Sequence, residues 1–159
     1  MPGSILLADD EEKILKTLGR ALRDEGHEVT TASNAREATR CLSERAFDLL
    51  IIDFLMPDRT GLDVIRELAA STPEAERPAI VMMTAHGSEE IAVAALKAGA
   101  ASYVPKRDLA RDLVPTTQKV LDMARTTRNQ QQILECLIET EFRFLLSNDP
   151  HRVQPDTAM

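Results

Sequence analysis

The sequence lacks any cluster of basic residues, and its formal net charge is −7. Proteins that bind nucleic acid or anionic membranes by charge carry basic patches, so this composition argues against both kinds of partner. Long apolar runs are missing too. The first apolar run reaches acidic residues after a few positions, which is too short for a signal peptide or a membrane span. We therefore expect a cytoplasmic protein.

Cysteine is also scarce. The two residues, Cys41 and Cys136, lie far apart, with no CxxC pair and no neighbouring histidine. This spacing indicates neither a disulfide framework nor a zinc site. Because no helix-turn-helix or zinc-binding output motif is recognisable either, DNA binding by this chain alone is not expected.

Short apolar runs alternate with longer amphipathic stretches along the chain. That alternation is typical of parallel strands that crossover helices bury on both faces. Five runs fit strands, at residues 4–8, 28–31, 49–53, 80–84 and 102–104. We predict an α/β fold with a doubly wound, five-stranded parallel sheet in the flavodoxin-like order 2-1-3-4-5, followed by a C-terminal extension.

Capping residues place helices between these strands. Gly26 ends a helix predicted over residues 11–25, and Asn34 with Glu37 three residues later begins a second one. Ser88 is predicted to cap a fourth helix. Leu62, Ile65 and Leu68 mark a third helix that begins after Gly61. Each crossover between consecutive strands is therefore expected to contain a helix.

Chemically active side chains follow several predicted strands at their C-terminal ends. They are Asp9, Asp10, Asp53, Thr84 and Lys106. These strand ends meet at one edge of the sheet, so the side chains should share a crevice. Three carboxylates there raise one another's pKa unless a cation compensates, and Mg²⁺ accepts such oxygen ligands together with phosphate oxygens. With a metal and an ammonium nearby, Asp53 can attack phosphorus and form an aspartyl phosphate.

Four segments resemble, in order and spacing, the receiver domains of two-component response regulators. They are ILLADDEEKI, LLIIDFLMPDRTGLDVI, VMMTAHGS and AGAASYVPK, and the resemblance runs over about residues 4–121. It implies that residues 1–124 form a receiver domain. The function implied is a phosphorylation-dependent signalling switch and not an enzyme that acts on external substrates.

The resemblance also implies roles for individual residues. Asp53 would accept the phosphoryl group from a sensor histidine kinase or a phosphotransfer protein. Mg²⁺ would be bound by Asp53, by Asp10 directly, by Asp9 through water and by the backbone carbonyl of Leu55.

Other residues would respond to the phosphoryl group. The resemblance implies that Thr84, Ala85 and Lys106 bind it and that Tyr103 turns inward as Thr84 moves. The surface of the fourth helix, fifth strand and fifth helix would then change, and the chain would form a homodimer through it.

Three positions depart from the family pattern or bear on phosphoryl lifetime, and Gly61 bears on the loop after Asp53. Arg107 follows Lys106 where the family has proline, so we expect a trans peptide there, since a cis bond costs about 2.5–4 kcal/mol without proline. Leu55 and His86 flank the approach of a hydrolytic water. Because apolar Leu55 cannot orient that water, we predict slow loss of the phosphoryl group. Gly61 is expected to allow a backbone conformation that other residues resist.

The C-terminal part of the chain has a different pattern. Asp112 is predicted to cap the fifth helix, because Pro115 is tolerated in a first turn but would kink a helix already running. Beyond a polar stretch, apolar and charged residues alternate over residues 138–146, which is typical of a half-buried strand. Residues 125–159 are interpreted as a linker helix followed by the start of an output domain, which resembles a GHKL-type domain, or by a dimerisation tail. A long dimerisation helix and a disordered tail are the alternatives.

Three other functions compete with the switch. A degenerate receiver could act as an unphosphorylated docking module. A flavodoxin-like domain would need a first loop rich in hydroxyl groups or glycine, whereas ADDEE is acidic. A phosphatase of the haloacid dehalogenase type would need an Asp-x-Asp pair, whereas Asp9 and Asp10 are adjacent.

Overall fold

The structure is a computed structural model that describes residues 2–85 and 89–148. At its centre is a five-stranded parallel sheet with the order β2-β1-β3-β4-β5. The strands are β1 (Ser4–Ala8), β2 (Glu28–Ala32), β3 (Leu49–Asp53), β4 (Ala79–Thr84) and β5 (Ser102–Pro105). The predicted fold class and strand order are confirmed.

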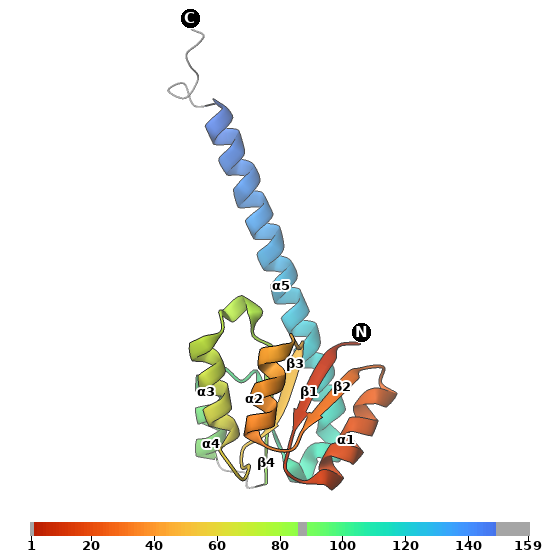
Figure 1. Ribbon diagram of the computed structural model, residues 1–159. Coiled ribbons are helices and arrows are strands. Elements are labelled where there is room, and N and C mark those ends of the chain that lie inside the picture. The colour runs from red at the N-terminus through yellow and green to blue at the C-terminus, as the bar shows by residue number, and fades with distance from the viewer. Residues whose placement is uncertain (1, 86–88, 149–159) are drawn as a thin grey trace, which may run out of the picture. The chain divides into compact units, whose positions relative to one another are not determined.

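Helices cover both faces of the sheet (Figure 1). On one face the core includes residues of α2 (Ala35–Glu44), α3 (Gly61–Ser71) and α4 (Glu89–Ala98). On the other it includes residues of α1 (Glu12–Asp24) and of the first part of α5 (Leu109–Asn148). Two 3₁₀ helices, η1 (Glu74–Glu76) and η2 (Lys106–Asp108), precede β4 and α5.

Strand β3 lies in the middle of the sheet, and all five of its residues are buried. Its continuous apolar run follows from burial on both faces. In the register, Ile52 is opposite Ala8 of β1 and Met82 of β4. The C-terminal ends of β1, β3 and β4 therefore meet at one edge, where the predicted site residues lie.

Local capping explains where several helices begin and end. Asn34 caps α2 as predicted, because its side chain accepts a hydrogen bond from the Glu37 N–H at 2.8 Å. Gly26, with φ of 93°, closes α1 in the left-handed conformation that glycine tolerates best. Thr60 begins α3 in a capping box with Asp63. The predicted Ser88 cap lies outside the described residues.

Helix α5 corrects the prediction for its own start. It begins at Leu109 and not at Asp112, so Pro115 lies inside the helix. Burial of Leu109 and Leu113 in the core stabilises the first turn, while Pro115 is exposed. Water can therefore reach the backbone carbonyl that proline leaves without its helical donor.

The predicted strand over residues 138–146 is wrong, because α5 continues through it to Asn148. A lone strand has no partner for its backbone N–H and C=O groups, whereas a helix satisfies them internally. The observed structure of this segment is a long helix, which is one of the alternatives to the strand.

The chain separates into two compact units, Met1–Met123 and Ala124–Met159. In the second unit, the described residues are helical and many apolar side chains are 58–66% exposed. They are Ile133, Leu134, Leu137, Ile138, Phe142, Phe144 and Leu145. No helix among residues 2–85 and 89–148 is both long and apolar enough to cross a membrane.

Candidate phosphoacceptor and metal site

The carboxylates predicted to share a crevice do lie together. Asp9 and Asp10 follow β1, Asp53 ends β3, and one ligand oxygen from each lies within 4.8 Å of the others. Asp9 and Asp53 are buried, whereas Asp10 is exposed. The cluster therefore has a buried floor and one side open to solvent.

Lys106 supplies the positive charge of the site. Its Nζ lies 2.9 Å from Asp9 Oδ2, 3.1 Å from Asp53 Oδ2 and 3.2 Å from Glu11 Oε2. The Lys106, Asp9 and Asp53 side chains are at most 14% exposed, so water screens these two ion pairs weakly, whereas Glu11 is 58% exposed. One ammonium therefore compensates three carboxylates.

Burial shifts the ionisation of the site. It raises the pKa of Asp53 to about 6, with a further contribution from the Asp9 charge, while Lys106 opposes both. Burial likewise raises the pKa of Asp9. Desolvation lowers the pKa of Lys106, but its interactions with Asp9 and Asp53 outweigh this effect and raise it. Another cation near the carboxylates would therefore relieve a real electrostatic cost.

Asp9 supports the expected metal. Its Oδ1 accepts a hydrogen bond from the Glu11 N–H at 2.9 Å. Its Oδ2 is buried and, among the described residues, accepts no hydrogen bond of regular geometry even though Lys106 is close. An oxygen in this state, beside two further carboxylates, fits a hard divalent cation with oxygen ligands.

Close backbone packing holds the loop after Asp53 at its two ends. The Phe54 N–H donates to the Met83 carbonyl, and the Gly61 N–H donates to the Phe54 carbonyl, both at 2.7 Å. A Cβ at Gly61 would overlap the Asp53 carbonyl oxygen. The expected reason for Gly61 is wrong: its φ is not positive, and the requirement is space beside the Asp53 backbone.

The remaining predicted site residues differ in how exposed their side chains are. Thr84 is buried at the end of β4, and Ala85 is exposed directly after it. Tyr103 in β5 is half-buried, and within the described part of the chain its buried hydroxyl has no hydrogen-bond partner. Leu55 is 63% exposed. His86 lies outside the described residues.

The peptide before Arg107 is trans, as expected. Lys106 reaches the carboxylates of Asp9 and Asp53 even though Arg107 stands where the family has proline.

Sequence reasoning missed two residues. Glu11 pairs with Lys106, and its place directly after the Asp9-Asp10 pair was the available signal. Asp58 accepts hydrogen bonds from the N–H groups of Ala35 and Arg36. That contact joins segments more than twenty residues apart, so no local pattern indicated it.

Comparison with known proteins agrees with this geometry. The family model described as "Response regulator receiver domain" matches residues 5–118. The regulator AlgB of Pseudomonas putida is 38% identical over 121 residues, covering 76% of this chain and 26% of AlgB. SrrA of Staphylococcus aureus is 31% identical over 157 residues, covering 98% of this chain and 64% of SrrA. The chain thus spans about a quarter of AlgB and less than two thirds of SrrA, both named as transcriptional regulatory proteins.

Solved structures are similar as well. A CheY-like receiver domain protein of Methanospirillum hungatei has a TM-score of 0.73 and 29% identity, covering 80% of this chain and 99% of that one. TrrA of Thermotoga maritima, solved in complex with Mg²⁺-BeF, has a TM-score of 0.65 and 30% identity, covering 74% and 97%. Receiver domains bind Mg²⁺ at an acidic site and act with histidine kinases or phosphotransfer proteins. The chain belongs to the response regulator receiver domain family.

Proposed function

We propose that this chain is a phosphorylation-dependent switch of a two-component system that accepts a phosphoryl group on Asp53. The observation that carries the proposal is the position of the Asp53 carboxylate. It is buried at the end of β3, 3.1 Å from the Lys106 ammonium and grouped with Asp9 and Asp10. The donor is a sensor histidine kinase or a phosphotransfer protein.

Asp9, Asp10, Asp53 and the Leu55 carbonyl are the residues that would hold Mg²⁺. When bound, the metal supplies positive charge that stabilises the phosphoryl oxygens during transfer. Exposed Asp10 leaves one side of the cluster accessible, so the donor can approach from solvent.

In the transfer, a carboxylate oxygen of Asp53 attacks phosphorus and forms a new P–O bond. The bond from phosphorus to the donor nitrogen or oxygen breaks, and its electron pair leaves with the donor. Lys106 already lies beside Asp53 and stabilises charge on the incoming group. The product is an aspartyl phosphate.

Thr84, Ala85 and Tyr103 would convert this event into a surface change. Thr84 ends the strand next to β3, where its hydroxyl can donate to a phosphoryl oxygen. The buried Tyr103 hydroxyl has no partner among the described residues, so a change of rotamer breaks no hydrogen bond to any of them. The changed surface is formed by α4, β5 and the first part of α5.

We infer that the activated chain forms a homodimer. The surface of α4, β5 and α5 carries exposed Ala101 and Arg111. In the second unit, the exposed apolar residues Leu137 and Phe144 lie seven positions apart, as do Ile138 and Leu145, and seven is the repeat of a coiled-coil seam. Residues 1–124 are then the receiver domain, and residues 125–159 a linker helix that leads to an output domain or a dimerisation tail.

The dimer can be tested by measuring molar mass in solution with and without Mg²⁺ and beryllofluoride. We expect the mass to double with beryllofluoride. Leu137→Glu should weaken the dimer, whereas Gln132→Glu, on the opposite side of the helix, should not. A mass that stays monomeric in the unmodified chain contradicts the inference.

The phosphoacceptor is tested by intact mass after incubation with acetyl phosphate and Mg²⁺. We expect the gain of a single phosphate, labile to hydroxylamine, in the unmodified chain and none in Asp53→Ala. No gain in either chain would favour the alternative, a degenerate receiver that acts as an unphosphorylated docking module.

A further inference from the structure

Residues 54–60, here called the acceptor loop, connect Asp53 to α3. The loop is anchored at its two ends by the backbone hydrogen bonds of Phe54 and Gly61 and by a bridge between Leu55 and Thr60. Between these anchors Met56 is buried in the core, whereas Pro57 and Asp58 are exposed. The Leu55 carbonyl, the expected backbone ligand of Mg²⁺, belongs to this loop, so loop geometry bears directly on the metal site.

Asp58 ties the middle of the loop to the N-terminus of α2. Its Oδ1 accepts the Ala35 N–H at 3.0 Å, and its Oδ2 accepts the Arg36 N–H at 2.8 Å. These are two of the N–H groups that a helix start cannot satisfy internally. Desolvation raises the pKa of Asp58, but the hydrogen bonds from backbone N–H groups together outweigh it and hold the pKa below its ordinary value. The carboxylate therefore stays charged near the positive end of the helix dipole.

The N-cap of α2 satisfies a different group. Asn34 Oδ1 accepts the Glu37 N–H at 2.8 Å. Asn34 and Asp58 thus divide the first turn of α2 between them without sharing a donor. Asp58 alone belongs to the acceptor loop, so the two caps can be separated by mutation.

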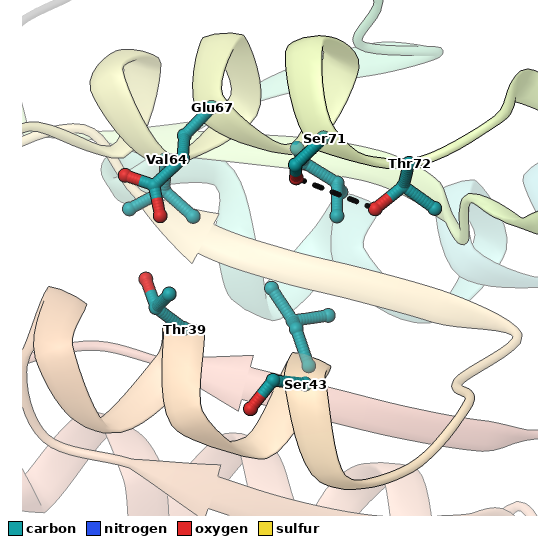
Figure 2. A pocket seen from close by; sticks show the side chains of 8 residues that line it. Thr39, Ser43, Val64, Glu67, Ser71 and Thr72 are labelled. Atoms are coloured by element: carbon teal, nitrogen blue, oxygen red, sulfur yellow. Dashed lines mark hydrogen bonds between the residues drawn. The ribbon is translucent and has the colours of Figure 1, made fainter.

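Arg59 makes a second link from the same loop. Its Nη2 donates to Thr39 Oγ1 of α2 at 2.9 Å, and its Nη1 pairs with Glu67 of α3. Thr39 and Glu67 lie on opposite sides of the groove between α2 and α3 (Figure 2). Two consecutive residues of the acceptor loop therefore contact α2, one at its first turn and one a turn further on.

We propose that Asp58 is a positioning residue that uses the first turn of α2 to hold the acceptor loop in the geometry that presents the Leu55 carbonyl to Mg²⁺. The part of this inference that concerns Mg²⁺ rests on the proposed function, whereas the part that concerns the structure of the acceptor loop does not. If Asp58 only capped α2, its removal would destabilise that helix, as removal of Asn34 would. If Asp58 positions the acceptor loop, its removal also loosens the loop and weakens the binding of a metal that Asp58 does not touch.

The experiment compares Asp58→Ala with Asn34→Ala, which removes a cap from the same helix turn but leaves the loop contacts intact. Amide hydrogen exchange without metal is measured first, under conditions where every chain is folded. We expect Asp58→Ala to exchange faster over residues 54–60, whereas Asn34→Ala exchanges faster only in α2. Asp58→Asn keeps an acceptor oxygen and should restore part of the protection.

Mg²⁺ affinity is then measured by titration calorimetry on the same chains. We expect about tenfold weaker binding for Asp58→Ala, as for other residues that orient a metal ligand, and near-normal binding for Asn34→Ala. Equal effects of the two variants on the loop and on Mg²⁺ overturn the positioning role. An unmodified chain that binds no Mg²⁺ overturns the proposed function and the metal step of this inference. The loop exchange decides the structural step in either case.

Discussion

Replacing Asp53 by asparagine should stabilise the folded protein in metal-free buffer. Burial, and then the charge of Asp9, raise the pKa of Asp53 from its ordinary 3.8 to about 6. Each pKa unit corresponds to about 1.4 kcal/mol, so the charged carboxylate costs the folded state about 3 kcal/mol at pH 7.5 relative to the unfolded state. Asparagine has nearly the same shape without the charge, and we expect it to recover about 2–3 kcal/mol of unfolding free energy.

The pH dependence follows from the raised pKa. At about pH 4, the carboxyl is almost fully protonated in the folded state and roughly 40% protonated in the unfolded state, so the two chains should differ by less than about 1 kcal/mol, and by less still at lower pH. As the pH rises, the unfolded chain releases this proton first. The unmodified protein therefore loses stability relative to Asp53→Asn until the pH passes the folded pKa of about 6. Above that pH the difference should stay constant.

Urea unfolding in EDTA measures the effect. Tyr103 is the single tyrosine and lies in the first unit, so its fluorescence reports on that unit without the helix from Ala124. Asp10→Asn is the matched control, because it removes a charge from an exposed position of the same cluster and should gain less. Saturating Mg²⁺ should narrow the gap by stabilising the chain that keeps Asp53. Equal or lower stability of Asp53→Asn at pH 7.5 in EDTA would refute the reasoning.

Three further changes test other parts of the site. Gly61→Ala places a Cβ against the Asp53 carbonyl and should lower the unfolding free energy by about 1–3 kcal/mol in urea titrations; an unchanged value would mean that the loop moves freely. Lys106→Met leaves the carboxylates without their ammonium, so the unfolding free energy should fall by about 3 kcal/mol at pH 7.5 and by less at pH 4. Thermal unfolding at both pH values measures the loss of stability, and equal losses would contradict the prediction. Leu55→Asn provides a side chain that can orient water and should shorten the phosphoryl lifetime, followed by intact mass after the donor is removed; an unaltered lifetime would show that Leu55 does not limit hydrolysis.

Much of the site could be predicted because strand ends are visible in a sequence. Apolar runs located β1, β3 and β4, and parallel strands end at the same edge. Polar residues at those ends, such as Asp53 and Thr84, were therefore expected to meet. The contact of Glu11 with Lys106 could not be predicted in the same way, because it depends on the side-chain geometry of two loops 95 residues apart.

The errors arose where two local patterns competed. Residues 138–146 alternate like a strand, but the same apolar residues also recur every three or four positions, as in a helix. Among residues 2–85 and 89–148 no strand pairs with this segment, and a helix satisfies its own backbone groups instead. Likewise, the position of Pro115 favoured a start of α5 at Asp112. The helix begins earlier, at Leu109, because Leu109 packs in the core.

The sequence by itself determined the order of strands and helices, the strand ends and the acidic cluster, because hydrophobic periodicity and capping act over a few residues. The tertiary structure alone decided which oxygens Lys106 reaches, why Gly61 must lack a side chain, and how Asp58 caps a helix more than twenty residues away. These features depend on distances between segments that meet only after the sheet has formed. They cannot be predicted from the sequence of any one segment.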